Sequence, residues 1–494
     1  MRIMVHRAII RLHVLTTVAL LLVLLFAGSS LAIEVQCGTV DGGYPTASPC
    51  TIGHADINVV FFTYSDVLGW PNATDALPSD ADQVLSDMSS YLERMSMGAH
   101  TASFNIVRRP GTNSGKQWVY PGSRQDDVCS QIWPWLDSQL PEGWETTPSL
   151  VIFIPSVLPA GVSNPYGQAD GLCHGPSTNQ FCNTFPVVGY AWVPYGYRTF
   201  SGQDPTWYPY PAELFRLILT HEYGHTLGLW HVPADYAGLQ GEGGCGAEYY
   251  QCYDPMDDSA SDNECANMAS INGFIPFSAV NMHHLGWWTP TIVSSTTTNI
   301  ILHDVRTTGE LLQIPLCSDE GFEDREYLLL ANYQQTQEDV ILGGRGLLVW
   351  HVRGKSGVYC PWDFASYDQV WDVESPTGKF ARDVGSYCAT WPKAADAAVG
   401  SDTLDCKPGM LASALWAGVS LQLSGQSMSE ATNPSTHRYA REYLSQIPVH
   451  RNFQQTWPSG VAISGIRAEP DPSRPGKYQV RLNVTISNQP GGCY

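Results

Sequence analysis

Residues Leu219–His231 read LTHEYGHTLGLWH, and this stretch decides how the first half of the chain folds. Counted from His221, the stretch has Glu222 at offset 1 and two further histidines, His225 at offset 4 and His231 at offset 10. On a helix, a spacing of four places two side chains one above the other, near enough to share one metal ion. Glu222 lies about 100° further round such a helix. It can therefore reach a metal-bound water without being a ligand.

The residues before the motif predict that it lies on a helix that packs inward. Pro211 suits the first helical turn. An apolar stripe begins at Leu214, Leu217 and Ile218. His221 and His225 extend this stripe, because each follows one of its leucine or isoleucine residues by seven positions, close to two turns.

The end of the motif brings in a third histidine. Gly228 can take a positive φ, so that the chain turns sharply and returns His231 to the other two rings. Three neutral imidazoles make an open tetrahedral zinc site whose fourth position holds water, and zinc lowers the pKa of that water to about 7. Glu222 can take the water's proton and pass it to the leaving amine. Histidines that merely fill a core are the alternative, but five positions in register favour the zinc site.

The charge balance excludes some partners. The chain of 494 residues has 26 Lys and Arg against 47 Asp and Glu. A chain this acidic is poorly suited to bind nucleic acid or anionic lipid. Its length suffices for two or three domains.

The first 32 residues are expected to be a signal peptide. Arg2, Arg7 and Arg11 form a basic start, Val14–Ala27 is apolar, and Ser30–Ala32 supplies small residues for cleavage. A membrane anchor is the alternative, but the apolar run is shorter than the ~20 residues of a spanning helix. The sequence therefore predicts a secreted protein with no stable membrane span after cleavage.

Cysteines and glycosylation sequons agree with secretion. All 13 cysteines follow the leader, and in an oxidising compartment most should pair. Because the number is odd, at least one thiol is free or bonded to another chain. Asn72 and Asn483 each begin an N-x-T sequon and are predicted glycosylation sites.

The segment HEYGHTLGLWH resembles the long zinc signature of the metzincin proteases. Those enzymes carry a methionine turn beneath the metal, and here Met256, in YDPMDD, follows His231 by 25 residues. The resemblance implies that His221, His225 and His231 bind zinc, that Glu222 is the catalytic base, and that Met256 is a hydrophobic floor. Some metzincins have an assisting tyrosine two residues after the methionine, whereas this chain has Asp258.

Within that group, the chain is most similar to the immune inhibitor A-like peptidases. The segment FSAVNMHHLGWW at Phe277–Trp288 resembles their closing helix, which ends in LGW. Glu326–Leu330, Gly343–Val352 and Val461–Ile466 resemble segments of their β-rich region, and the resemblance spans roughly 57–490. That family often lacks a histidine at the third ligand position. Gametolysin, an algal wall-degrading metzincin, shares the histidine signature and remains a neighbouring possibility.

We therefore expect an α+β fold: a metzincin-type catalytic domain with a twisted mixed sheet, an active-site helix and a Met turn, then a β-rich, sandwich-like C-terminal region. The expected parts are a signal peptide at 1–32, a loop or short pro-segment at 33–54, the catalytic domain at 55–290 and the C-terminal region at 291–494. Apolar runs predict strands in the first half. They are Ile57–Thr63, Thr101–Val107, Leu150–Ile154 and Val187–Val193.

Two further features complete the expected fold. Helical spacing from Ala81 to Met95 predicts a helix capped by Ser79 and ended by Gly98. After Trp288, Thr291–Thr298 is typical of a linker, and short apolar runs then predict sandwich-like β modules. Those modules either dock on the catalytic domain or bind carbohydrate.

Three weaker candidates have plainer alternatives. His283, His284 and His351 are expected to be structural rather than substrate contacts. A second group, dense in acidic residues, suggests Ca²⁺, although a solvated loop is favoured. It comprises Asp257, Asp258, Asp262 and Glu264. Cys37 could silence the zinc as a pro-segment thiolate, but a disulfide to Cys50 is favoured, because no basic residue flanks it.

These inferences predict a secreted zinc endopeptidase whose peptide substrate lies extended along an edge strand near Val187–Val193. Its partners would be proteins or peptides, with extracellular glycoprotein or cell-wall material as candidates. The alternative is an extracellular adhesion or carbohydrate-binding protein on a silent, zinc-stabilised protease scaffold.

Overall fold

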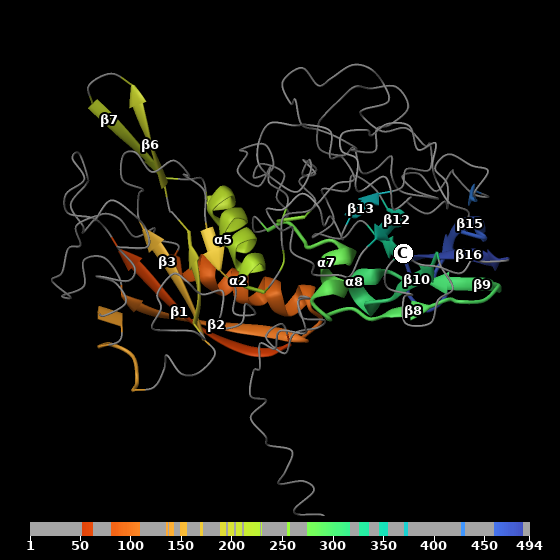
Figure 1. The fold of residues 1–494 in the computed structure, drawn as a ribbon, viewed down its shortest axis with the longest axis horizontal. Helices are drawn as coiled ribbons and strands as arrows, with labels where there is room; N and C mark the ends of the chain where they lie inside the picture. The colour runs from red at the N-terminus through yellow and green to blue at the C-terminus, as the bar shows by residue number, and fades with distance from the viewer. Residues whose placement is uncertain are drawn as a thin grey trace, which may run out of the picture. The chain divides into compact units, whose positions relative to one another are not determined.

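Strands from the first half of the chain form a five-stranded mixed sheet in the computed structural model (Figure 1). The strand order is β2-β1-β3-β5-β4, with β1, β2, β3 and β5 mutually parallel and β4 antiparallel to β5. The bounds are β1 Gly53–Phe62, β2 His100–Arg108, β3 Ser149–Pro155, β4 Gln168–Asp170 and β5 Val188–Trp192.

The structure describes part of the chain. The described residues are 52–62, 81–108, 135–136, 138–142, 149–155, 168–170, 188–193, 196–201, 204–209, 212–227, 229, 254–256, 274–316, 326–334, 345–353, 370–373, 426–429 and 459–487. Within some elements only the backbone is described, and His225 is such a residue.

The four strands predicted from apolar runs are all present. β1 begins four residues earlier than its predicted start at Ile57, and the other three differ by one residue at either end. The prediction that the strand near Val187–Val193 lies at the edge of the sheet was wrong. β5 is covered by β4, whose residue Ala169 pairs with Ala191, so among the described strands β4 lies at the edge. Three residues are too few to show a period, which is why the sequence did not reveal this strand.

Two helices pack beside the sheet and against each other (Figure 1). α2 spans Ala81–Met95 and α5 spans Ala212–Thr226. The Thr220 hydroxyl lies 3.6 Å from the sulfur of Met88, and Arg216 Nη2 lies 3.3 Å from Asp87 Oδ2. The residues of the predicted stripe whose side chains are described are buried, and Gly98 follows the end of α2 with φ of 82°. They are Leu85, Met88, Leu92 and Met95.

Helix α5 is buried more completely than a single stripe predicts. Leu214, Leu217 and Ile218 are buried as expected, but so is every residue of Leu217–Gly224. A helix that is enclosed on all sides is a core element of a large domain. Hence Glu222, placed beside the predicted stripe, is also removed from solvent.

A hairpin and a short helix complete the first half of the described chain. β6 (Gly196–Ser201) and β7 (Asp204–Pro209) form an antiparallel hairpin that the sequence reading did not anticipate. α7 (Ala279–His284) is capped by Ser278, whose side chain accepts a hydrogen bond from Asn281 N. This helix lies in the segment predicted to close the catalytic domain.

The second half forms two sheets that share one apolar core. The first has the order β13-β12-β11-β10-β8 and the second β14-β15-β16-β9. Their bounds are β8 Pro290–Ile292, β9 Thr297–Leu302, β10 Leu311–Pro315, β11 Glu326–Tyr333, β12 Gly346–Arg353, β13 Val370–Val373, β14 Gln426–Met428, β15 Val461–Pro470 and β16 Tyr478–Ile486. Leu330 and Val349 of the first sheet belong to the same buried cluster as Ile463 and Leu482 of the second. The linker prediction for 291–298 was wrong at both ends, since β8 and β9 occupy them.

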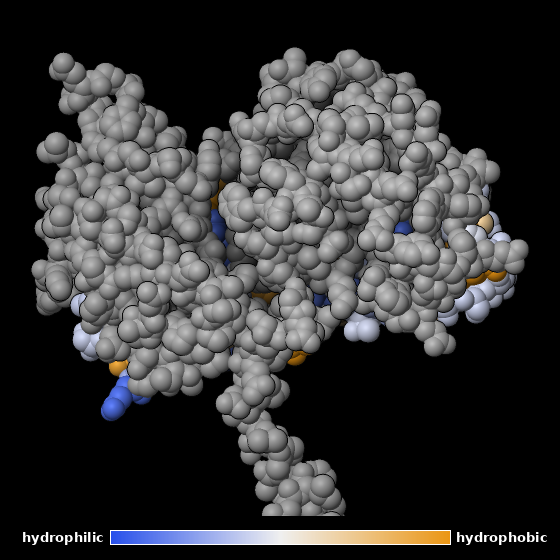
Figure 2. Space-filling view, in the orientation of Figure 1, coloured by the Kyte–Doolittle hydropathy of each residue, from blue (hydrophilic) through white to orange (hydrophobic). Residues whose placement is uncertain are grey.

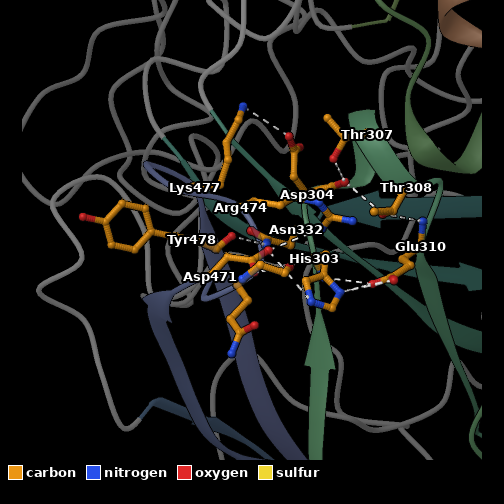
Figure 3. A network of polar contacts seen from close by, with 12 residues as sticks. His303, Asp304, Thr307, Thr308, Glu310, Asn332, Asp471, Arg474, Lys477 and Tyr478 are labelled. Carbon is orange, nitrogen blue, oxygen red and sulfur yellow. Dashed lines mark hydrogen bonds and ion pairs between the residues drawn. The ribbon is translucent and has the colours of Figure 1, made fainter.

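A polar network joins the two sheets (Figure 3). Asp304 caps the short helix α8 (Val305–Thr308) and lies 3.4 Å from Lys477 Nζ. The Asn332 amide, fully buried on β11, donates to the carbonyls of Leu302 on β9 and Tyr478 on β16 at 3.0 and 3.1 Å. One side chain therefore satisfies two backbone acceptors from the opposite sheet.

The exposed surface of the described residues carries few large apolar side chains. Figure 2 shows hydrophilic and hydrophobic residues interspersed where the described chain reaches this face. The exposed large hydrophobics among them are Ile52, Met97 and Ile292. In the same part of the chain, no helix has the length and apolar character needed to cross a bilayer.

Replacing Asn332 with leucine tests the joint between the sheets. Asn332→Leu keeps the number and branching of the side-chain heavy atoms but leaves one buried and one part-buried carbonyl without this donor. We expect it to lower the free energy of unfolding by about 1–3 kcal/mol. Chemical denaturation followed by circular dichroism measures the loss. Thr298→Val, at an exposed position of β9, is the control and should change stability little. Equal stability of the two variants would contradict the structural role of Asn332.

Candidate active site

The C-terminal half of α5 delivers the first two residues of the histidine motif. His221 and Glu222 are 8% and 3% exposed. Burial strengthens any electrostatic interaction that these side chains make, because little water screens it. His225 follows one turn later on the same helix. Its side chain lies outside the described residues, as does all of His231.

The ring of His221 is oriented by a backbone carbonyl. Its Nδ1 lies 2.6 Å from the carbonyl oxygen of Pro255. Because a carbonyl oxygen can only accept, Nδ1 carries the proton, and in the neutral ring Nε2 then carries the lone pair. Metal-ligating histidines are typically held in this way, with the second ring nitrogen donating to a carbonyl or carboxylate.

Met256 lies directly against α5. A Cβ added to Gly224 would come 2.2 Å from the Met256 sulfur and 3.3 Å from Phe277. Glycine at this position therefore permits an approach at which any other residue would force the Met256 side chain to shift. The structure thus brings Met256, fully buried, to the helix segment between His221 and His225. Its function as the floor of a zinc site stays a prediction.

Asp254 anchors this turn from within the core. Its Oδ1 accepts the N–H of Met256 at 2.8 Å, and its Oδ2 accepts from Ser278 N at 2.7 Å and from Asn281 Nδ2 at 2.8 Å. Burial raises the pKa of Asp254, and these donors oppose that rise. Three donors converge on one carboxylate that water cannot reach.

Tyr91 of α2 supports the segment that leads into α7. Its hydroxyl donates to the carbonyl of Ile275 at 2.7 Å, and its ring stacks on Phe274 with centroids 4.9 Å apart. Burial, followed by the nearby Asp254 carboxylate, raises the pKa of Tyr91 well above its ordinary value. Tyr91 therefore stays a neutral hydrogen-bond donor.

On the other side of α5, Tyr223 contacts strand β2. Its hydroxyl lies 2.7 Å from Nε2 of His100, and the His100 ring stacks on Trp287 with centroids 5.5 Å apart. All three side chains are buried. Trp287, the tryptophan of the LGW segment, is thus linked through His100 to Tyr223, the residue that follows Glu222.

His351 and His283 make contacts within the described part of the protein. Nε2 of His351 lies 3.1 Å from Glu326 Oε1 across two paired strands, and both side chains are buried. Nδ1 of His283 lies 3.3 Å from the carbonyl oxygen of Trp288. These contacts support the structural interpretation for His351 and His283.

Asn483, a predicted glycosylation site, lies within β16 opposite Ser464. Its side-chain oxygen accepts the N–H of Asn299 at 2.8 Å, where β9 has a left-handed residue. The side chain therefore already has a structural function in the sheet. Its glycosylation stays a prediction.

Several predicted features lie outside the described residues. They are the leader 1–32, all the cysteines including Cys37 and Cys50, Asn72, His231, and the acidic residues Asp257, Asp258, Asp262 and Glu264. Of His225, the side chain lies outside the described part. Within the described part, no three His, Cys, Asp or Glu side chains are grouped to hold a metal. The zinc and calcium predictions both depend on residues beyond that part.

Comparison with known proteins assigns no family. No protein-family model and no curated protein matches the chain. The proposals below therefore rest on the residues and their geometry.

Sequence reasoning missed three parts of this site: Gly224, Asp254 and the Pro255 carbonyl. The resemblance to metzincins implied a turn at Met256. No local pattern, however, tells which distant atom such a turn contacts.

Gly224→Ala tests the close approach of the Met256 turn. Alanine normally stabilises a helix interior by about 1 kcal/mol relative to glycine. Here we expect a net loss of about 1–3 kcal/mol, because the buried Met256 must move to accommodate the new methyl group. Thermal unfolding measures the change, with Ser86→Ala on the exposed face of α2 as the control. A stabilised Gly224→Ala protein would show that the turn does not press on the helix.

Proposed function

We propose that the chain is a secreted zinc-dependent endopeptidase of the metzincin type. The observation that carries this proposal is the placement of His221 beside Glu222 on a buried helix, with Nδ1 of His221 fixed by the Pro255 carbonyl at 2.6 Å. The motif spacing and the Met256 turn supply the rest of the argument.

The donor set fits zinc. The fixed tautomer directs the lone pair of His221 to Nε2, which suits a zinc ligand. His225 and His231 would complete a three-histidine set. A zinc ion held there would supply Lewis-acid polarisation of the scissile carbonyl and lower the pKa of water.

Glu222 is proposed as general base and then general acid. It precedes Tyr223, whose hydrogen bond to His100 limits rotation of this part of α5. A carboxylate so placed takes a proton from the attacking water and returns it to the amine that leaves. Its burial keeps bulk water from competing for that proton.

The substrate edge must be reassigned from β5 to β4. Because β4 covers β5, an extended peptide that adds to this sheet would pair with Gln168–Asp170. Main-chain pairing of this kind suits protein or peptide substrates of varied sequence. Extracellular glycoproteins or cell-wall proteins are therefore the proposed targets of the secreted form.

Glu222→Gln tests the proposed chemistry. We expect this variant to keep its zinc content, because Glu222 is not a ligand, and to lose peptide cleavage by roughly 10²–10⁴-fold. Elemental analysis and a fluorogenic peptide assay measure the two quantities on the secreted protein. Glu93→Gln, on the exposed face of α2, is the control and should cleave normally. Undiminished cleavage by Glu222→Gln would remove Glu222 from the mechanism.

A peptide library tests the activity as a whole. The purified secreted protein should cleave members of a diverse library, and a zinc chelator should abolish the cleavage. If zinc is bound but no peptide is cleaved, the silent-scaffold alternative holds. The same full-length protein can then be tested for binding to immobilised glycans.

A further inference from the structure

Asp254 and His221 are connected through one peptide bond. The N–H that Asp254 Oδ1 accepts belongs to Met256, and the carbonyl that accepts from His221 Nδ1 belongs to Pro255. These two groups are the opposite ends of the same planar unit, the Pro255–Met256 peptide. Holding its N–H end therefore fixes the direction in which its carbonyl points.

The carboxylate also affects the strength of the second hydrogen bond. A peptide group that donates to a negative charge becomes a better acceptor at its carbonyl, because hydrogen bonds in series polarise one another. In a buried site this effect is not screened by water. The Pro255 carbonyl consequently holds the proton of His221 on Nδ1 more firmly than an isolated carbonyl would.

Asparagine cannot replace Asp254 in this arrangement. Both carboxylate oxygens face donors: Met256 N on one side, Ser278 N and Asn281 Nδ2 on the other. An amide NH₂ in either position would meet another donor. Only a group with two acceptor oxygens satisfies all three donors.

The carboxylate is itself held by helix α7. Ser278 is the N-cap of that helix and Asn281 lies in its first turn, so two of the three donors come from one rigid element. The chain of contacts therefore runs from α7 through Asp254 and the Pro255–Met256 peptide to the ring of His221.

We propose that Asp254 is a positioning residue for His221: through the Pro255–Met256 peptide it fixes the ring's orientation and its Nδ1–H tautomer, so that Nε2 is prepared to bind a metal ion. The inference deepens the proposed function and rests on it only in taking His221 as a metal ligand. The tautomer itself can be measured without any metal.

Asp254→Asn is the direct test, with two readouts. In the metal-free protein, ¹⁵N NMR of labelled histidine should show the Nδ1–H tautomer for His221 in the parent and a mixture in the variant. The His221 signal is assigned by its loss in His221→Gln. Affinity for Zn²⁺ should fall roughly 10–100-fold, as for other partners of a ligating histidine.

Tyr91→Phe is the matched control. It removes a buried hydrogen bond, to Ile275, in the same packed region without touching the Pro255–Met256 peptide. We expect it to lower stability but to leave the His221 tautomer and the zinc affinity unchanged. A general loosening of the core would instead affect both variants alike.

If Asp254→Asn does not fold, Asn281→Ala replaces it, because it removes one donor to Oδ2 and leaves Met256 N in place. An intermediate population of the second tautomer is then expected. A folded Asp254→Asn or Asn281→Ala protein with an unchanged His221 tautomer overturns the proposal. A parent protein that shows the Nδ1–H tautomer but binds no zinc would refute the proposed function and leave the positioning of the ring intact.

Discussion

The hydrogen bond between Nδ1 of His221 and the Pro255 carbonyl is the interaction on which the candidate site depends. It joins the C-terminal half of α5 to a turn 34 residues further along the chain. A histidine on a helix can rotate about two torsions, and both ring nitrogens can carry the proton. This one contact restricts the orientation of the ring and places the proton on Nδ1. Nε2 could then bind a metal ion without reorganisation of the ring.

Close packing is what makes that contact geometrically possible. The Met256 sulfur lies where a side chain at residue 224 would begin, so glycine lets the turn pack this closely on the helix. Enclosing α5 on all sides also places Glu222 within the core. Taking a carboxylate out of water costs free energy that interactions in the folded protein must offset. Residues held at such a cost are typical of functional sites, where local stability is given up for a reactive arrangement.

A feature of the fold or of the site could be predicted from the sequence where the residues that determine it lie close together in the chain. Strands β1 and β3 followed from continuous apolar runs, and the motif spacing predicted that His221 and Glu222 lie on one helix, as they do in α5. β4 was missed because three residues carry no period, and its pairing placed β5 inside the sheet instead of at the edge. Asp254 and Gly224 were missed for a different reason: their importance lies in contacts to residues distant in sequence, which one sequence does not encode locally.

The segment Phe277–Trp288 gains its significance from the same long-range contacts. From its N-terminal end, Asn281 holds Asp254 and so, through one peptide unit, the ring of His221. From its C-terminal end, Trp287 packs on His100, which hydrogen-bonds Tyr223. Residues 221 and 223 are thus restrained from two sides of α5 by one short segment. Glu222 lies between them, so its position about the helix axis is set by restraints on its neighbours.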